Sequence, residues 1–210
     1  YCDTGIGLSA QRIYVEMLCD HYGWQLWTLR THENFEDHTD DEGFYGPSQH
    51  AKIYNVLKDR QVSKLATSSG NPHLYYGTRR AESSKRRDIA RHRWDEGKGA
   101  HVHNPIADWS DKKVAEYIQR QEIPYNPLWE GSHPTDCACG ATAAREELLE
   151  LEAEGFEVFA EKLRNLEDRA EDGKRGTWAW GSFSEKEQRA LDTAADDAQQ
   201  TLMCGPNCGG

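Results

Sequence analysis

The sequence predicts an α/β fold, with helices on both faces of a twisted parallel sheet and a helical C-terminal extension. Short apolar segments alternate with helical patterns from residue 1 to about residue 122, which is typical of βαβ units and a parallel sheet. At 142–172 the pattern changes to a charged, strongly helical stretch. We therefore expect an α/β domain at 1–136 and a helical extension at 137–210.

The chain opens with a predicted strand, turn and helix. "YCDTG" is typical of a strand end followed by a turn. A helix is expected at 9–22, because apolar residues such as Ile13 and Met17 recur at helical spacing. Ser9 can cap its first turn, and Gly23 follows as a C-terminal stop.

The next elements are predicted from shorter patterns. Bulky residues alternate at 24–30 as in a strand, and the acid-rich segment 32–47 is interpreted as a loop. A helix is expected at 49–60, after Ser48. Short apolar runs at 64–70 and 73–79 are compatible with strands.

The remaining part of the α/β domain contains one more strand and helix. Residues 85–100 are expected to be irregular or helical. A short strand at 101–109 leads into a loop, and its histidines are interpreted as polar lining rather than metal ligands. Helical spacing returns at 110–121, and the tail at 176–202 is expected to form a loop and another helix.

Composition limits the function classes. A length of 210 residues suffices for one ordinary domain with a real core. The net charge is −11, from 36 acidic and 25 basic residues, which argues against wholesale attachment to DNA or to a membrane surface. No apolar run approaches the ~18 residues of a membrane span, and the start does not resemble a signal peptide. We expect a cytoplasmic protein without a membrane partner, and the acid excess would also suit a halophilic source.

One basic island interrupts this acidic chain. Residues 79–93 carry seven Arg or Lys and two acidic residues, which indicates an anion site or a patch for a polyanion, with a solvated helix that makes salt bridges as the alternative. Open α/β sheets bind ligands beyond the carboxyl ends of strands. The candidate loops are therefore 3–9, 68–87 and 104–110.

Three motifs resemble one known family in its order. "YGTRRAESSKR" resembles the G-x-R-R-x-x-S signature of the phosphoadenosine phosphosulfate (PAPS) reductase family. "NPIADWSDKKVAEYIQRQEIPYNPLWEGSH" resembles the segment that follows in that family, and "YCDTGIGLSAQRIYVEML" resembles its second strand and helix. The resemblance spans residues 1–140.

The resemblance implies an adenine nucleotide α-hydrolase-like fold that holds ATP or a sulfonucleotide (PAPS or its 3′-dephospho form, APS). It also implies roles for the matching positions. Asp3, Thr4 and Gly5 would lie near the nucleotide, and its sulfate or phosphate would be bound by Arg79, Arg80, Ser83 and Arg86. The wall of the nucleotide site would be formed by Asp108 and Trp109, and its lid by Tyr125, Pro127 and Trp129. Among these, Arg79 and Arg80 are the candidate catalytic arginines.

Two features depart from the family pattern. The family begins with a strand and a Ser-Gly-Gly-Lys-Asp-Ser phosphate loop, which would lie upstream of Tyr1, so the α/β domain is predicted to be N-terminally incomplete. The thiol-dependent reductases end in a Glu-Cys-Gly-(Leu/Ile)-His motif. This chain ends in "MCGPNCGG", which shares Cys-Gly and makes Cys204 the candidate catalytic thiol.

Four cysteines form the candidate metal site. They lie in "CACG" and "CGPNCGG" as Cys137, Cys139, Cys204 and Cys208. Four thiolates suit zinc or an iron–sulfur cluster, and resemblance to the cluster-bearing adenylylsulfate reductases and phosphorothioation relatives favours [4Fe–4S]. Surface thiols or disulfides are the alternatives.

The expected function is an enzyme of sulfur metabolism. It would reduce PAPS or APS to sulfite, or activate a substrate with ATP for sulfur insertion into DNA, as in DNA phosphorothioation, or into tRNA. Its partners would be a thiol reductant or sulfur donor. The alternative is a non-enzymatic nucleic-acid-binding or accessory protein with structural zinc.

Overall fold

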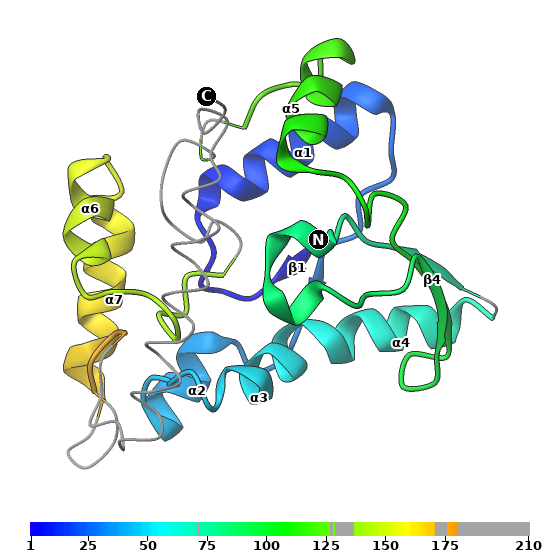
Figure 1. Ribbon diagram of the computed structural model, residues 1–210. Coiled ribbons are helices and arrows are strands. Elements are labelled where there is room, and N and C mark those ends of the chain that lie inside the picture. Colours follow the sequence, from blue (N-terminus) through cyan, green and yellow to red (C-terminus); the bar gives the residue numbers. More distant parts are fainter. Residues whose placement is uncertain (71, 127, 129–136, 171–175, 180–210) are drawn as a thin grey trace. The chain divides into compact units, whose positions relative to one another are not determined.

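The computed structural model describes residues 1–70, 72–126, 128, 137–170 and 176–179 (Figure 1). Within these residues the chain contains helices and parallel strand pairs, which confirms the predicted α/β class. It divides into two compact units, described in turn below. The first unit contains the described residues of 1–61 and 126–179, and the second those of 62–125. The predicted domain boundary at residue 136 stays a prediction.

The first unit begins with the predicted strand and helix. Strand β1 (Cys2–Asp3) pairs in parallel with β2 (Leu29–Arg30), and helix α1 (Ser9–Tyr22) connects them. The helix ends as expected at Gly23, whose φ of 66° is in the left-handed region. Its N-cap is Leu8 instead of Ser9, and no side chain caps it. The strand expected over 24–30 is limited to its last two residues.

A helix replaces the loop expected at 32–47. Helix α2 (Phe35–Glu42) begins with a capping box, in which Asn34 accepts from the backbone N–H groups of Glu36 and Asp37. The Asp37 side chain in turn accepts from the Asn34 N–H at 2.8 Å. These reciprocal hydrogen bonds satisfy the first free N–H groups of the helix and fix where it starts.

The following helical segment is longer than predicted. It comprises α3 (His50–Tyr54), a π-helical turn η1 (Asn55–Asp59) and α4 (Arg60–Ser68). The strand expected at 64–70 is therefore wrong. Its short apolar run belongs to a helix, and a run of this length cannot by periodicity be distinguished from a strand.

The core of the first unit joins its early helices to the C-terminal ones. Helices α6 (Glu147–Ala153) and α7 (Glu157–Arg169) lie within the predicted helical extension. Their apolar positions recur three or four residues apart and are buried: Leu148, Leu151, Ala160, Leu163 and Leu166. They belong to the same apolar cluster as Phe35, Ile53 and Trp178. The extension is thus part of one core with the start of the chain.

The second unit contains a mixed three-stranded sheet. Its order is β3 (His73–Tyr75), β5 (Ala100–His103) and β4 (His92–Asp95). Strand β5 runs parallel to β3 and antiparallel to β4. The strands at β3 and β5 were expected. The segment predicted to be irregular or helical at 85–100 contains a 3₁₀ turn and irregular backbone, but also the unexpected strand β4.

Helix α5 (Asp111–Arg120) follows β5 as expected. Its N-cap is Ser110, whose hydroxyl accepts from the Lys113 N–H at 3.2 Å. No helix among the described residues is both long and apolar enough to cross a membrane.

Gly140 packs closely against Trp178, a residue of the first unit's core. Its φ is +74°, and a Cβ there would lie 2.5 Å from Nε1 of the fully buried Trp178. Gly155 has a comparable φ of +90° but no neighbour within 4 Å of a Cβ. We predict that Gly140→Ala destabilises the protein by about 1–3 kcal/mol more than Gly155→Ala, because only the former adds an overpacking cost to the backbone strain. Urea unfolding of both variants measures this difference in the free energy of unfolding. Equal losses of stability in the two variants would contradict the close packing of Gly140 against Trp178.

Candidate functional sites in the two units

In the first unit, hydrogen bonds and an ion pair hold the loop after β1 against β2 and the start of α2. The carboxylate of Asp3 accepts from the Gly5 N–H at 3.1 Å and pairs with Arg30 at 2.8 Å. Thr4 is buried, and its carbonyl accepts from the Phe35 N–H at 3.3 Å. Gly5 has a φ of 77°, and a Cβ there would lie 3.3 Å from Cβ of Asn34. A glycine therefore allows the loop to approach the N-terminus of α2.

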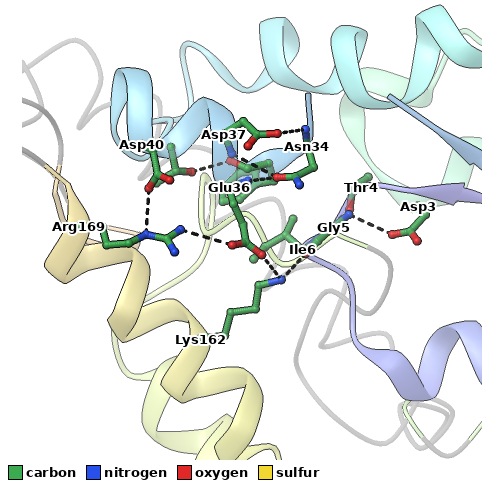
Figure 2. Close-up of polar contacts among 12 residues, drawn as sticks. Asp3, Thr4, Gly5, Ile6, Asn34, Glu36, Asp37, Asp40, Lys162 and Arg169 are labelled. Carbon is green, nitrogen blue, oxygen red and sulfur yellow. Dashed lines mark hydrogen bonds and ion pairs between the residues drawn. The ribbon is translucent and has the colours of Figure 1, made fainter. Parts of the chain in front are cut away.

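A lysine from α7 contacts the same loop (Figure 2). The Lys162 ammonium donates to the Gly5 carbonyl at 2.7 Å and pairs with Glu36 at 2.7 Å. Arg169 extends this network, with contacts of 3.4 Å to Glu36 and 3.1 Å to Asp40. The hydrogen bond from Lys162, followed by the charges of Lys162 and Arg169, lowers the pKa of Glu36 despite its partial burial.

The first cysteine pair lies beside this loop. The Ala138 N–H donates to the Ile6 carbonyl at 2.8 Å, so "CACG" is adjacent to the segment after Gly5. The hydrogen bond with Cys137, together with burial, raises the pKa of the Cys139 thiol well above its usual value. This shift favours the neutral thiol form of Cys139.

The other two cysteines of the predicted metal site, Cys204 and Cys208, lie outside the described residues. Within the described ranges, no group of three or more His, Cys, Asp or Glu side chains could hold a metal ion. The two adjacent sulfurs of Cys137 and Cys139 fit one half of a four-thiolate site, provided that the metal displaces their protons.

In the second unit, two loops meet beyond the carboxyl ends of β3 and β5. Because these strands are parallel, their carboxyl ends lie at the same edge of the sheet. The Arg80 N–H donates to the Ala107 carbonyl at 2.8 Å and ties the two loops together. The predicted residues Arg79, Arg80, Asp108 and Trp109 are therefore brought into one cluster.

The two candidate catalytic arginines are fixed by different partners. Arg79 is only 15% exposed, and its Nη1 lies 2.6 Å from Asp111 and 3.4 Å from the Trp109 carbonyl. Arg80 donates through Nε and Nη2 to the Ile89 carbonyl, at 3.0 and 2.8 Å, and through Nη1 to Asp108. In the described part of the chain these contacts use three of the five N–H donors of the Arg80 guanidinium. The remaining two can bind an anion.

The other predicted anion ligands lie on the same turn. Ser83 separates two short 3₁₀ turns, and its carbonyl accepts from the Arg86 N–H at 3.0 Å. The Arg86 side chain is half exposed and pairs with Glu82, which also lies 3.3 Å from Arg79. Asp3, Thr4 and Gly5 belong to the first unit, so their relation to this turn stays a prediction.

Of the predicted lid residues, Tyr125 is exposed, whereas Pro127 and Trp129 lie outside the described residues. Sequence reasoning missed Asp111 and Lys162. Asp111 follows the cap Ser110 directly and could have been found as the first acidic residue of a helix. Lys162 is far from Gly5 in the sequence, and no local pattern indicates their contact.

The ion pair between Glu36 and Lys162 yields a pH-dependent prediction. Because the folded-state pKa of Glu36 is lowered from its ordinary value of 4.5, the pair stabilises the protein above that pH. This stabilisation is lost as the pH falls through the folded-state pKa. Both side chains are about a third exposed, so we expect Glu36→Gln to cost about 0.5–1 kcal/mol at pH 7, after allowance for solvent screening.

Urea unfolding at pH 7 and at acidic pH measures the cost of this substitution. The cost should shrink in acid, where Glu36 of the wild type is itself protonated. Asp41→Asn is the matched control, because Asp41 lies on the same helix and is exposed. A cost for Glu36→Gln that is independent of pH would contradict the ion pair.

Comparisons with known proteins identify the family. The family model of the phosphoadenosine phosphosulfate reductase domain matches residues 1–135. The adenosine 5′-phosphosulfate reductase of Allochromatium vinosum is 27% identical over 140 residues, which cover 63% of this chain and 53% of the relative. The phosphoadenosine 5′-phosphosulfate reductase of Xanthomonas oryzae pv. oryzae is 34% identical over 93 residues, which cover 43% of this chain and 35% of the relative.

A solved structure, a PAPS reductase from Candida auris in complex with phosphate, is also similar. Its sequence identity is 17% and its TM-score is 0.48, with 64% of this chain and 66% of that chain covered. The chain spans about half the length of the first curated relative. The family model matches well over half of the chain in one continuous segment, and the chain belongs to the phosphoadenosine phosphosulfate reductase domain family.

Proposed function

We propose that this chain is part of an enzyme of sulfur metabolism that binds an adenine nucleotide and reduces it or activates it for sulfur transfer. The observation that carries the proposal is the cluster of Arg79 and Arg80 beyond the carboxyl ends of two parallel strands. This is where open α/β sheets bind their ligands. The relatives with sequence similarity are themselves named as sulfonucleotide reductases.

The chemistry of the arginines suits the anionic end of such a nucleotide. When the bond to a sulfate or phosphate breaks, negative charge develops on the departing oxygens. Donors that are already fixed stabilise this charge without reorganising during the reaction. The contacts of Arg80 with Asp108 and the Ile89 carbonyl fix its guanidinium in this way. Arg79, which is mostly buried, would supply a second fixed charge.

In the reductive form of the proposal, a thiolate attacks the sulfur of the sulfonucleotide, and the nucleotide phosphate leaves with the bonding electrons. A second thiol then displaces sulfite, and the two thiols are oxidised to a disulfide. The two electrons come from these two thiols, and a thiol reductant partner restores the reduced protein. Cys204 is the proposed first thiol, although it lies outside the described residues.

As an alternative role for Cys204, in which it is a ligand and not the attacking thiol, we propose that Cys137 and Cys139 contribute half of a four-cysteine centre with Cys204 and Cys208. The adjacent sulfurs and their position beside the loop after β1 support this role. A bound [4Fe–4S] cluster would supply electrostatic stabilisation or electrons. Zinc would supply structural stabilisation alone.

The alternative function, nucleic-acid binding through residues 79–93, has less support. The guanidinium groups of this island are paired with carboxylates at five positions: Arg79, Arg80, Arg86, Arg91 and Arg93. Local pairing reduces the net field that would attract a polyanion. Affinity for DNA or RNA that falls steeply with salt would favour the alternative.

The products of turnover distinguish the two forms of the proposal. Purified full chain is incubated with PAPS or APS and a dithiol, and sulfite is measured. In parallel it is incubated with ATP, and pyrophosphate is measured. Sulfite release supports reduction, pyrophosphate release supports activation, and the absence of both would contradict the proposed function.

We predict that Arg80→Gln lowers the rate of the active reaction by about 100-fold, because removing one fixed donor to a developing negative charge has about this effect. Arg80→Lys should restore little of the lost rate, since an ammonium lacks the planar fork that can bind the Ile89 carbonyl and an anion together. Arg120→Gln is the control, as Arg120 is an exposed residue of α5 in the same unit. Unchanged turnover in folded Arg80→Gln protein would remove this residue from the site.

A further inference from the structure

One face of the sheet in the second unit is covered by imidazole and aromatic rings. Successive side chains of a strand point to opposite faces of the sheet, so every second residue lies on the same face. The strand register places His73 beside His101 and His92 beside His103, with Tyr75 and Trp94 completing a grid of two rows by three strands. The four histidines are exposed or half-buried. The opposite face contains the buried Ala100 and Val102.

The rings of this grid pack side by side across the strands. Their planes are nearly parallel in several neighbouring pairs, including His73 with His103, at 5.1 Å and 16°, and His92 with His101, at 5.4 Å and 15°. Each of these two diagonal pairs also brings two ring nitrogens together. Nδ1 of His73 lies 2.9 Å from Nε2 of His103, and Nε2 of His92 lies 3.2 Å from Nδ1 of His101.

These nitrogen separations match those of neighbouring ligands on a transition metal. Imidazole nitrogens bind such ions at about 2.0–2.1 Å. Two bonds of this length to nitrogens 2.9 Å apart enclose an angle of about 90°, as between adjacent ligands of an octahedral or square-planar ion. A separation of 3.2 Å gives about 100°, which is closer to tetrahedral.

We propose that the pair His73–His103 of this histidine face, formed by His73, His92, His101 and His103, binds a divalent transition-metal ion of the nickel, copper or zinc class. Neutral imidazole is a preferred ligand of these ions, whereas Mg²⁺ and Ca²⁺ prefer oxygen. The torsion that orients a histidine ring is broad, so an exposed ring can turn its lone pair toward an ion at little cost. When the ion binds, the donor imidazole of the N···N pair moves its proton to its other ring nitrogen, so both rings stay neutral and each offers a lone pair.

The site is open, with two protein ligands per ion. No group of three or more His, Cys, Asp or Glu side chains among the described residues could hold an ion. The pair His73–His103 therefore supplies two adjacent positions, and water or an added ligand fills the others. The site is separate in sequence from the four-cysteine centre and does not depend on the proposed function.

The test is Ni²⁺ binding to the full chain by calorimetry, together with NMR of protein labelled with ¹⁵N-histidine. Ni²⁺ is paramagnetic, so it broadens the ring signals of its ligands. We expect binding in the wild type, broadening of the His73 and His103 ring signals, and no binding of Mg²⁺. Removing a residue that only hydrogen-bonds to a metal ligand weakens metal binding about 10–100-fold. The double variant His73→Gln, His103→Gln removes the ligands themselves, so it should weaken Ni²⁺ binding at least about ten-fold.

The matched control is the double variant His21→Gln, His32→Gln, which makes the same change at two exposed histidines of the first unit. It should bind Ni²⁺ like the wild type. Circular dichroism should show that both double variants are folded, since the substituted side chains are on the surface. Equal Ni²⁺ affinity in the wild type and in the double variant His73→Gln, His103→Gln would overturn the proposal. So would a wild-type complex with a thiolate charge-transfer band and no broadening of the sheet histidines.

Discussion

The parallel pairing of β3 with β5 is the constraint on which the proposed anion site depends. Parallel strands place their carboxyl ends at one edge, so the turn with Arg79 and Arg80 must lie beside the loop with Asp108. The backbone hydrogen bond between Arg80 and Ala107 then fixes the distance between the two loops. The arginines consequently owe their position to backbone pairing, and their side-chain partners set only the orientation of each guanidinium.

In the first unit, the C-terminal helices act on the start of the chain. Leu163 and Leu166 of α7 are buried in the same apolar cluster as Phe35. This packing brings Lys162, on the same helix, to the carbonyl of Gly5. A segment that sequence patterns present as an appendage therefore orders the loop after β1, and a change in α7 can reach that loop through one hydrogen bond.

Sequence reasoning succeeded where a pattern had a local physical cause. The end of α1 followed from Gly23, and the start of α5 followed the helical spacing after Ser110. The capping box between Asn34 and Asp37 is also a readable signal, although the acidic residues around it suggested a loop. Other features have no such signal. The polar sequence of β4 lacks apolar alternation, and the strand forms because β5 offers it a paired edge. The arginine turn was predicted from the basic island and the family motifs, whereas the pairing of Arg79 with Asp111 and of Arg80 with Ile89 required coordinates.

The most direct test of the central claim is a crystal structure of the full chain with bound adenosine 3′-phosphate 5′-phosphosulfate or its product, adenosine 3′,5′-bisphosphate. We predict that an anionic group of the nucleotide accepts hydrogen bonds from the guanidinium groups of Arg79 and Arg80, at the carboxyl ends of β3 and β5. A nucleotide bound with its anionic groups elsewhere, and with both arginines contacting only their protein partners, would contradict the account.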